Sequence, residues 1–390
     1  MLLPLRLSLF YAAYFLILGI QLPFWPVWLE SRGLSAGEIG TVLAVALWVR
    51  IVTIPVAGVV VDRTGNRRTA LILLSAAALA ASLLYLPADG FVPILLVTVL
   101  MSAGFSPIMN IGDNLTLLVA RAHRLDYGRM RLWGSVSFIA AASLGGIVVA
   151  DSRPETVLHL LIGAMALTAL SCWLAPKPPP RAPTGDGVPL RTSRIAALLR
   201  DPGFLLFLGA TSAVQSSHAV YYAFGTLHWR GLGHSEAVIG GLWAEGVIAE
   251  ILLFAFGGAA TARLGPARLL VLAGLAALVR WAGTAVAESV PVLALLQVLH
   301  GMTFGAAHLA AMQYIAKAVP IDRSATAQAL YGALATGMGT ALAMMLAGAA
   351  YAGLGAAAYH AMAALGLAGA VFALLLASRG RQDEVRAADA

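Results

Sequence analysis

Ionisable residues inside long apolar runs are the positions where this sequence could do chemistry. Arg50, Asp113, Glu250, Arg280 and His300 each lie within such a run. A charge at the depth of a bilayer is costly unless it pairs or faces water, so each of these residues is a candidate functional residue. The chemistry that they could do is the binding of a polar solute and the movement of a proton.

The composition requires a membrane around these positions. Of the 390 residues 60% are hydrophobic and only 11% are charged, whereas a soluble domain has about 25% charged residues. The formal net charge of +7 comes from basic residues that lie between the apolar runs and do not form one face. We therefore expect an all-α integral membrane protein whose partner is the lipid bilayer and not nucleic acid. Cys172 is the only cysteine, which excludes an intramolecular disulfide.

Twelve apolar runs are long enough to cross a bilayer, which takes about 17–25 residues. They cover residues 6–29, 37–61, 69–87, 92–120, 128–150, 155–175, 202–227, 236–260, 267–287, 291–316, 325–350 and 358–378. The basic residues gather in the loops of one side, while the opposite loops hold only Arg32, Arg153 and Arg230. The positive-inside rule then predicts that both termini are cytoplasmic, in a bacterial cytoplasmic membrane.

The chain repeats itself at a constant offset of 200 residues. Ser35 matches Ser235, Gly58 matches Gly258, and the same offset places Arg50 opposite Glu250. Duplicated membrane halves are typical of transporters that rock one half against the other. We predict two pseudo-symmetric six-helix halves (1–175 and 201–378), a proline- and glycine-rich cytoplasmic linker (176–200) and a charged, disordered tail (379–390).

The loop between the second and third runs carries the most specific motif. Residues 58–68 have the pattern G-x-x-x-D-R-x-G-x-R-R, which resembles the signature of the major facilitator superfamily. The resemblance implies a conformational latch formed by Asp62, Arg63, Gly65 and Arg68. The second copy has Ala262 in place of the acid. The alternative is that these arginines only fix the topology.

Further runs of residues resemble one family of this superfamily in particular, the phenylpropionate transporter family, which is similar to the lactose permeases. They cover residues 22–29, 126–135, 218–222, 247–250, 279–281 and 300–312. Asp113 and Arg131 occupy positions like the acid–arginine pair that grips sugar in lactose permeases, and Phe138 falls near the stacking aromatic. For an aromatic carboxylate, Arg131 could hold the substrate in a bidentate fork while Asp113 holds the guanidinium. The alternative is a structural salt bridge that closes the cytoplasmic side.

In the second half, Arg280 and His300 resemble the arginine and histidine of the lactose permease proton circuit. Thr303 stands where the essential acid of that circuit would be, so we predict Glu250 as the proton carrier. His308 follows His300 at i+8 and could relay the proton.

Aromatic and amide residues complete the predicted substrate site. His218, Tyr221 and Tyr222 lie within one turn of each other and suit an aromatic ligand. Arg50, Trp25 and Asn110 are the remaining candidates for substrate binding. Arg50 could instead pair with an acid of the other half, and amides also tie helices together.

These observations predict a monomeric, proton-coupled symporter that imports a small organic solute. Our first choice of substrate is an aromatic or phenylpropanoid monocarboxylate, and the alternatives are a sugar or a nucleoside. A passive facilitator and a non-transporting sensor also remain open. Because the sequence has no Walker loop, metal-ligand cluster or nucleophile elbow, we predict neither an enzyme nor a cofactor or metal.

Overall fold

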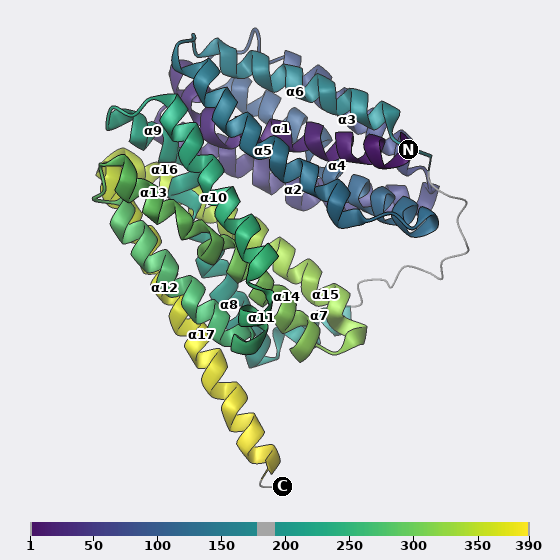
Figure 1. Ribbon diagram of the computed structural model, residues 1–390, viewed down its shortest axis with the longest axis vertical. Coiled ribbons are helices and arrows are strands. Elements are labelled where there is room, and N and C mark those ends of the chain that lie inside the picture. The colour runs from purple at the N-terminus through teal and green to yellow at the C-terminus, as the bar shows by residue number, and fades with distance from the viewer. Residues whose placement is uncertain (1, 178–191, 389–390) are drawn as a thin grey trace. The chain divides into compact units, whose positions relative to one another are not determined.

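The computed structural model describes residues 2–177 and 192–388, and within those ranges every regular element is a helix (Figure 1). The chain divides into two compact units. Unit 1 comprises Met1–Gly185 and Ala223–Ala244, and unit 2 comprises Asp186–Tyr222 and Glu245–Ala390. This agrees with the all-α class expected from the composition.

Unit 1 contains the first six long helices. Their bounds are α1 Leu2–Ser31, α2 Ala36–Thr64, α3 Arg67–Leu83, α4 Phe91–His123, α5 Tyr127–Ala150 and α6 Glu155–Leu174. Helix α1 packs against α5 and α6, while α4 packs against α2 and α3. Gly19 makes the α1–α5 contact possible, because a Cβ there would lie 2.7 Å from the Phe138 carbonyl oxygen.

The ends of α2 illustrate how local sequence sets the helix bounds. Ser35 caps the start through a capping box, in which its hydroxyl accepts from the Glu38 amide and the Glu38 carboxylate accepts from the Ser35 amide. Gly65 ends the helix with φ 70°, a left-handed conformation that favours glycine. These two signals define one continuous helix of 29 residues.

Residues 223–244 cluster with unit 1, although the repeat in the sequence predicts that they belong to the second half. The start of α10 (Glu236–Phe256) lies directly on the backbone of α5. A Cβ at Gly146 would lie 2.3 Å from the Glu236 carbonyl oxygen, and one at Gly240 would lie 2.1 Å from that of Ala142. Arg230 also forms ion pairs with Glu30 and Glu236. The division of the fold at the linker therefore stays a prediction.

The second part of the described chain contains more elements, most of them short. The α-helices are α7 Thr192–Leu199, α8 Pro202–Ser216, α9 Ala219–Gly231, α10, α11 Gly258–Leu264, α12 Pro266–Thr284, α13 Val290–Val298, α14 Ala307–Ala318, α15 Ser324–Leu330, α16 Thr340–Leu354 and α17 Ala358–Ala388. Two π-helical stretches, η1 Gly301–Ala306 and η3 Tyr331–Gly339, and two 3₁₀ turns, η2 Ile321–Arg323 and η4 Gly355–Ala357, interrupt them. π-Bulges are frequent at functional sites, and η1 adjoins the polar cluster described below.

Helices α12 and α17 form the most extensive helix contact of unit 2 and lie side by side in Figure 1. Gly274 and Gly366 face the partner backbone there. A Cβ at Gly274 would lie 2.6 Å from the Ala370 nitrogen and 2.7 Å from the Gly366 oxygen. Small residues that let helix backbones approach are a main source of packing between membrane helices.

We expect Gly274→Ala to destabilise the protein. Alanine has the better helix propensity, by about 1 kcal/mol, but the new methyl group would meet backbone atoms that cannot move away, and overpacking costs about 1–3 kcal/mol. Gly163→Ala is the matched control, because a Cβ at that helical position has nothing within 4 Å. Melting of the detergent-purified variants should show a lower midpoint for Gly274→Ala only. An unchanged or higher midpoint would contradict the close crossing.

The described residues contain nine helices long and apolar enough to cross a membrane, or ten if the bent pair Ser193–Leu199 and Pro202–Gly231 is one span. The predicted third run corresponds to α3, which has 17 residues. The last two predicted runs lie in one stretch, Ser324–Arg379. A straight helix of 56 residues would be about 84 Å long at 1.5 Å per residue, far more than a bilayer core of about 30 Å. Gly355, with φ 54°, interrupts it, and the number of twelve spans stays a prediction.

The predicted linker and the predicted tail both contain helical residues. Residues 178–191 of the predicted linker lie outside the described residues, but α7 is helical within it and buries Leu198 in the core of unit 2. Helix α17 continues to Ala388, and the disordered tail stays a prediction. Most residue types in the stretch 379–388, including Arg, Gln, Glu and Ala, have high helix propensity. Residues 389 and 390 lie outside the described residues.

Candidate functional site

Arg280 forms the centre of a buried polar cluster in unit 2. It lies one turn before the end of α12 and its side chain is fully buried. Its Nη2 donates to Gln297 Oε1 at 2.6 Å, and its Nη1 donates to Thr303 Oγ1 at 2.9 Å and to His300 Nδ1 at 3.0 Å. The partners come from α13, from η1 and from the turn between these two elements. Three segments thus fix the orientation of one guanidinium group.

Aromatic rings enclose the remaining faces of this guanidinium. Its carbon lies 4.3 Å from the centroid of the Trp281 ring and 4.9 Å from that of Tyr221. His218 stacks on Tyr222 and meets the rings of Trp281 and His300 edge to face. The cluster therefore combines a cation with several ring faces, which suits a ligand that is both anionic and aromatic.

The hydrogen bonds indicate that His300 is neutral and are compatible with a neutral His218. His218 Nδ1 lies 3.2 Å from the carbonyl oxygens of Val214 and Gln215, so this nitrogen donates and Nε2 can accept from the Thr303 hydroxyl at 3.1 Å. His300 Nδ1 accepts from Arg280 and so carries no proton. Arg280 is then surrounded by neutral partners.

Within the described residues no carboxylate lies within ion-pair distance of Arg280. Its Nε is buried and has no hydrogen-bond partner there. A buried charge without a counter-charge is strongly unfavourable. The geometry therefore favours an anion at this position.

Glu250 approaches the same cluster from α10. Gly301 and Gly305 of η1 allow this approach: a Cβ at Gly301 would lie 2.9 Å from the Ala249 oxygen, and one at Gly305 would lie 3.2 Å from Glu250 Cγ. The half-buried Glu250 interacts electrostatically with Tyr222, which also interacts with Arg280. The charges of Glu250 and Arg280 thus both influence Tyr222.

His308 does not join this cluster. It is exposed, and its Nδ1 lies 3.4 Å from the Tyr331 hydroxyl. The i+8 spacing from His300 assumes an α-helix, but η1 has i→i+5 hydrogen bonds and changes the helical phase between the two residues. The structure therefore gives no support to the predicted relay through His308.

In unit 1, Asp113 and Arg131 share Tyr11 as a neighbour and do not form the expected pair. The hydroxyls of Tyr11 and Tyr127 donate to Asp113 Oδ1 at 2.6 and 3.1 Å. The Arg131 guanidinium carbon lies 4.3 Å from the centroid of the Phe15 ring and 5.3 Å from that of Tyr11. No ion pair joins Asp113 to Arg131 in the described chain, because the tyrosine ring occupies the position between them.

The other predicted binding residues of unit 1 lie in different surroundings. Arg50 is exposed and, like Asp113 and Arg131, interacts electrostatically with Tyr14. Asn110 is exposed. Trp25 and Phe138 are buried packing residues: Trp25 stacks on Trp28 at 4.4 Å, and Phe138 lies against α1. Arg50 therefore lies close to the Asp113 region, while the two buried aromatics stabilise the helix contacts.

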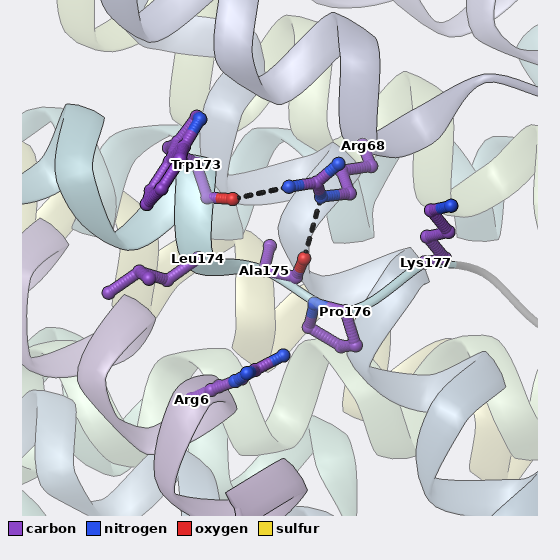
Figure 2. Close-up of a pocket in the computed structure, with 7 residues that line it drawn as sticks. All are labelled: Arg6, Arg68, Trp173, Leu174, Ala175, Pro176 and Lys177. Atoms are coloured by element: carbon purple, nitrogen blue, oxygen red, sulfur yellow. Dashed lines mark hydrogen bonds between the residues drawn. The ribbon is translucent and has the colours of Figure 1, made fainter.

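The loop between α2 and α3 is held by an arginine that the predicted latch does not include. Arg67 is buried, lies 3.5 Å from Asp62 and donates to Asn114 Oδ1 of α4. Arg68 instead donates to the carbonyl oxygens of Trp173 and Ala175 at the end of α6 (Figure 2). These carbonyls have no partner within the helix. Arg63 is exposed, and Gly65 ends α2 as described above.

We expect Arg67→Gln to lower both thermal stability and transport rate. The substitution removes the buried guanidinium that holds the exposed Asp62 and Asn114 oxygens. Since water can replace the lost donor there, the expected cost is that of an ordinary hydrogen bond, about 0.5–1.5 kcal/mol. Arg63→Gln is the matched control, because this side chain is exposed and surface substitutions change stability by about 0.5 kcal/mol or less. Melting midpoints and initial uptake rates should fall for Arg67→Gln and not for Arg63→Gln. An equal fall in both variants would mean that the loop needs only its positive charge and not the contacts of Arg67.

Several residues of these clusters were not among the predicted site residues, among them Tyr11, Arg67, Gln297 and Thr303. Gln297 could have been found from its spacing, since it is a lone amide in an apolar run three residues before His300. Thr303 continues that spacing by another three residues. Tyr11 has no comparable signal, because its partner Asp113 is distant in the sequence. Arg67 belongs to the 58–68 motif, but its contact with Asn114 of α4 is not encoded there.

Comparisons with known proteins agree with this architecture. The model of the MFS_1 like family matches residues 4–362. The chain is 32% identical over 361 residues to a probable 3-phenylpropionic acid transporter of Escherichia coli (strain K12), covering 93% of this chain and 94% of that one. It is 28% identical over 377 residues to a maltose permease of Geobacillus stearothermophilus, covering 96% and 94%. A crystal structure of the nucleoside transporter NupG superposes with a TM-score of 0.82 at 16% identity, covering 97% of this chain and 98% of that one.

Proposed function

The chain belongs to the MFS_1 like family, whose members are membrane transporters, and from this premise we propose that it imports an aromatic monocarboxylate together with a proton. The observation that carries the proposal is the fully buried Arg280, which has aromatic neighbours and no carboxylate partner within the described residues. The substrate would supply the missing negative charge. The relative named as a probable 3-phenylpropionic acid transporter agrees with this class of solute.

The substrate carboxylate binds Arg280 in this proposal, and its ring lies among Tyr221, Tyr222 and His218. This changes the predicted role of Arg280 from proton coupling to substrate binding. Arg280 already donates to Gln297, Thr303 and His300. The bound carboxylate would therefore take the place of one of these neutral acceptors or share its N–H donor. The Arg280 bonds already have an ionised donor, and a carboxylate would add a counter-charge and a bidentate geometry, which favours this exchange.

Glu250 carries the proton in this proposal. Glu250 and Arg280 both act on Tyr222, so a carboxylate bound at Arg280 would face a like charge if Glu250 were ionised. Like charges in one site favour protonation of one of them. Substrate and proton therefore assist each other's binding, and such coupling is reciprocal. This reciprocity is what a symporter requires.

The test is uptake of radiolabelled 3-phenylpropionate into vesicles that contain the purified protein. An inward pH gradient should drive accumulation above the external concentration, and a protonophore should abolish it. Vesicles without the protein report the direct permeation of the neutral acid, which must be subtracted. Equilibration without accumulation would favour a passive facilitator. No protein-dependent uptake of the acid would leave sugars and nucleosides as the substrates to test, since relatives are named for both.

A further inference from the structure

A cavity of about 380 Å³ opens in unit 1 at the end of α6. Its lining comes from three segments: Arg6 near the start of α1, Arg68 at the start of α3, and residues 173–177 at and beyond the end of α6. Figure 2 shows Arg6 and Arg68 extending toward this α6 end from two sides, with Lys177 beside them. Three basic residues that are distant in the sequence thus meet at one opening.

The charge of this cavity is not balanced by an acid among the described residues. Arg68 uses Nε and Nη2 to bind the carbonyl oxygens of Ala175 and Trp173. For Arg6 and Lys177 the described chain provides no ion pair and no side-chain hydrogen bond, and the lining contains no Asp or Glu. An anion with several oxygen acceptors would satisfy these donors.

Two apolar stripes lead away from the cavity along the helices that line it. Helix α6 exposes Leu167, Leu170 and Trp173, which are 50–58% accessible and recur every three residues. Helix α1 exposes another stripe, formed by Leu2, Leu5 and Leu9. In a membrane protein such surfaces contact acyl chains, and tryptophan favours the level of the headgroups. The cavity therefore lies where a lipid headgroup would meet the protein.

We propose that this cavity, which we call the α6 basic pocket (Arg6, Arg68 and Lys177), binds the phosphate of an anionic phospholipid. The acyl chains lie along the stripes of α6 and α1. A free phosphate would use the same basic groups, but only a lipid would also use the exposed leucines. The start of α1, the start of α3 and the end of α6 lie on the side that the basic loops assign to the cytoplasm. Basic pockets on that side of membrane proteins recognise anionic headgroups.

Native mass spectrometry of the purified, delipidated protein tests this proposal. Titration with phosphatidylglycerol should give a saturable bound species, whereas phosphatidylcholine with the same acyl chains should bind far more weakly. The double variant Arg6→Gln/Lys177→Gln should bind phosphatidylglycerol about 25-fold more weakly, since each basic residue near an anionic lipid contributes a factor of about five. Inorganic phosphate at millimolar concentration should not displace the lipid.

The matched control is Arg121→Gln/Arg200→Gln, which removes two exposed basic residues outside the cavity. It should bind the lipid as the unmodified protein does. An equal loss in the control, equal binding of phosphatidylcholine, or displacement by phosphate would each overturn the proposal. If the double variant melts early in lipid-free detergent, Lys177→Gln alone replaces it, because this side chain is exposed, and a loss of about fivefold is expected. Transport activity does not enter the readout, so the outcome is independent of the proposed function.

Discussion

Replacement of Arg280 by glutamine is expected to weaken strongly the binding of an aromatic carboxylate. The guanidinium is fully buried, and its three hydrogen-bonded partners are neutral side chains. Removal of one member of a buried, hydrogen-bonded charge pair costs about 2–5 kcal/mol. The dissociation constant of 3-phenylpropionate should therefore rise at least about 30-fold and up to several thousand-fold, as measured by calorimetric titration of the purified variant.

The neutral amide of the same acid is the control ligand for this variant. Its affinity should change little, because it carries no charge for Arg280 to neutralise. Arg280→Lys is a second variant, since it keeps the cation and loses the planar fork, and it should retain part of the carboxylate affinity. If both variants lose acid and amide to the same extent while their melting midpoints stay unchanged, Arg280 shapes the site and does not recognise the carboxylate.

Glu250→Gln is expected to uncouple substrate movement from the proton gradient. Glutamine is close in size to the protonated glutamic acid, so the site stays in its substrate-binding state but releases no proton. Uphill uptake driven by an imposed pH gradient should be lost, while exchange of internal for external substrate should continue at a comparable rate. Vesicle uptake and counterflow with the same preparation measure both quantities.

Glu245→Gln provides the matched control on the same helix. Glu245 is half-buried and lies five residues before Glu250, on a different face of α10. This variant should accumulate substrate as the unmodified protein does. Full accumulation by Glu250→Gln would remove Glu250 from the role of proton carrier, and loss of both activities would point to a structural role instead.

Much of the cluster in unit 2 could be predicted from the sequence because of one strong physical rule. Polar residues are expensive at bilayer depth, so Arg280, His300 and His218 stood out in apolar runs, and the structure brings all three together. The neighbouring tyrosines followed from their spacing to His218. The all-helical class followed from composition, since backbone groups in lipid must be satisfied within helices.

The places where the structure differs from the expected contacts share another cause, which is local geometry that the hydropathy pattern does not encode. The π-helical stretch η1 shifts the phase after His300, and His308 then leaves the cluster. In unit 1, the side chain of Tyr11 separates Asp113 from Arg131, although both spans were predicted. Arg67 pairs with Asp62, whereas Arg68 binds the end of α6. Which of the two adjacent arginines faces Asp62 depends on the rotation of α3 about its axis, and the sequence does not encode that rotation.

Thermal stabilisation of the purified protein by a panel of ligands tests the central claim most directly. The panel holds 3-phenylpropionate, its neutral amide, maltose and a nucleoside at matched concentrations, because only a ligand that binds the folded state raises the melting midpoint. We predict a clear rise with the acid, a small or absent rise with the amide, and none with maltose or the nucleoside. Stabilisation by maltose or the nucleoside without any effect of the acid would contradict the assignment of Arg280 as a carboxylate site.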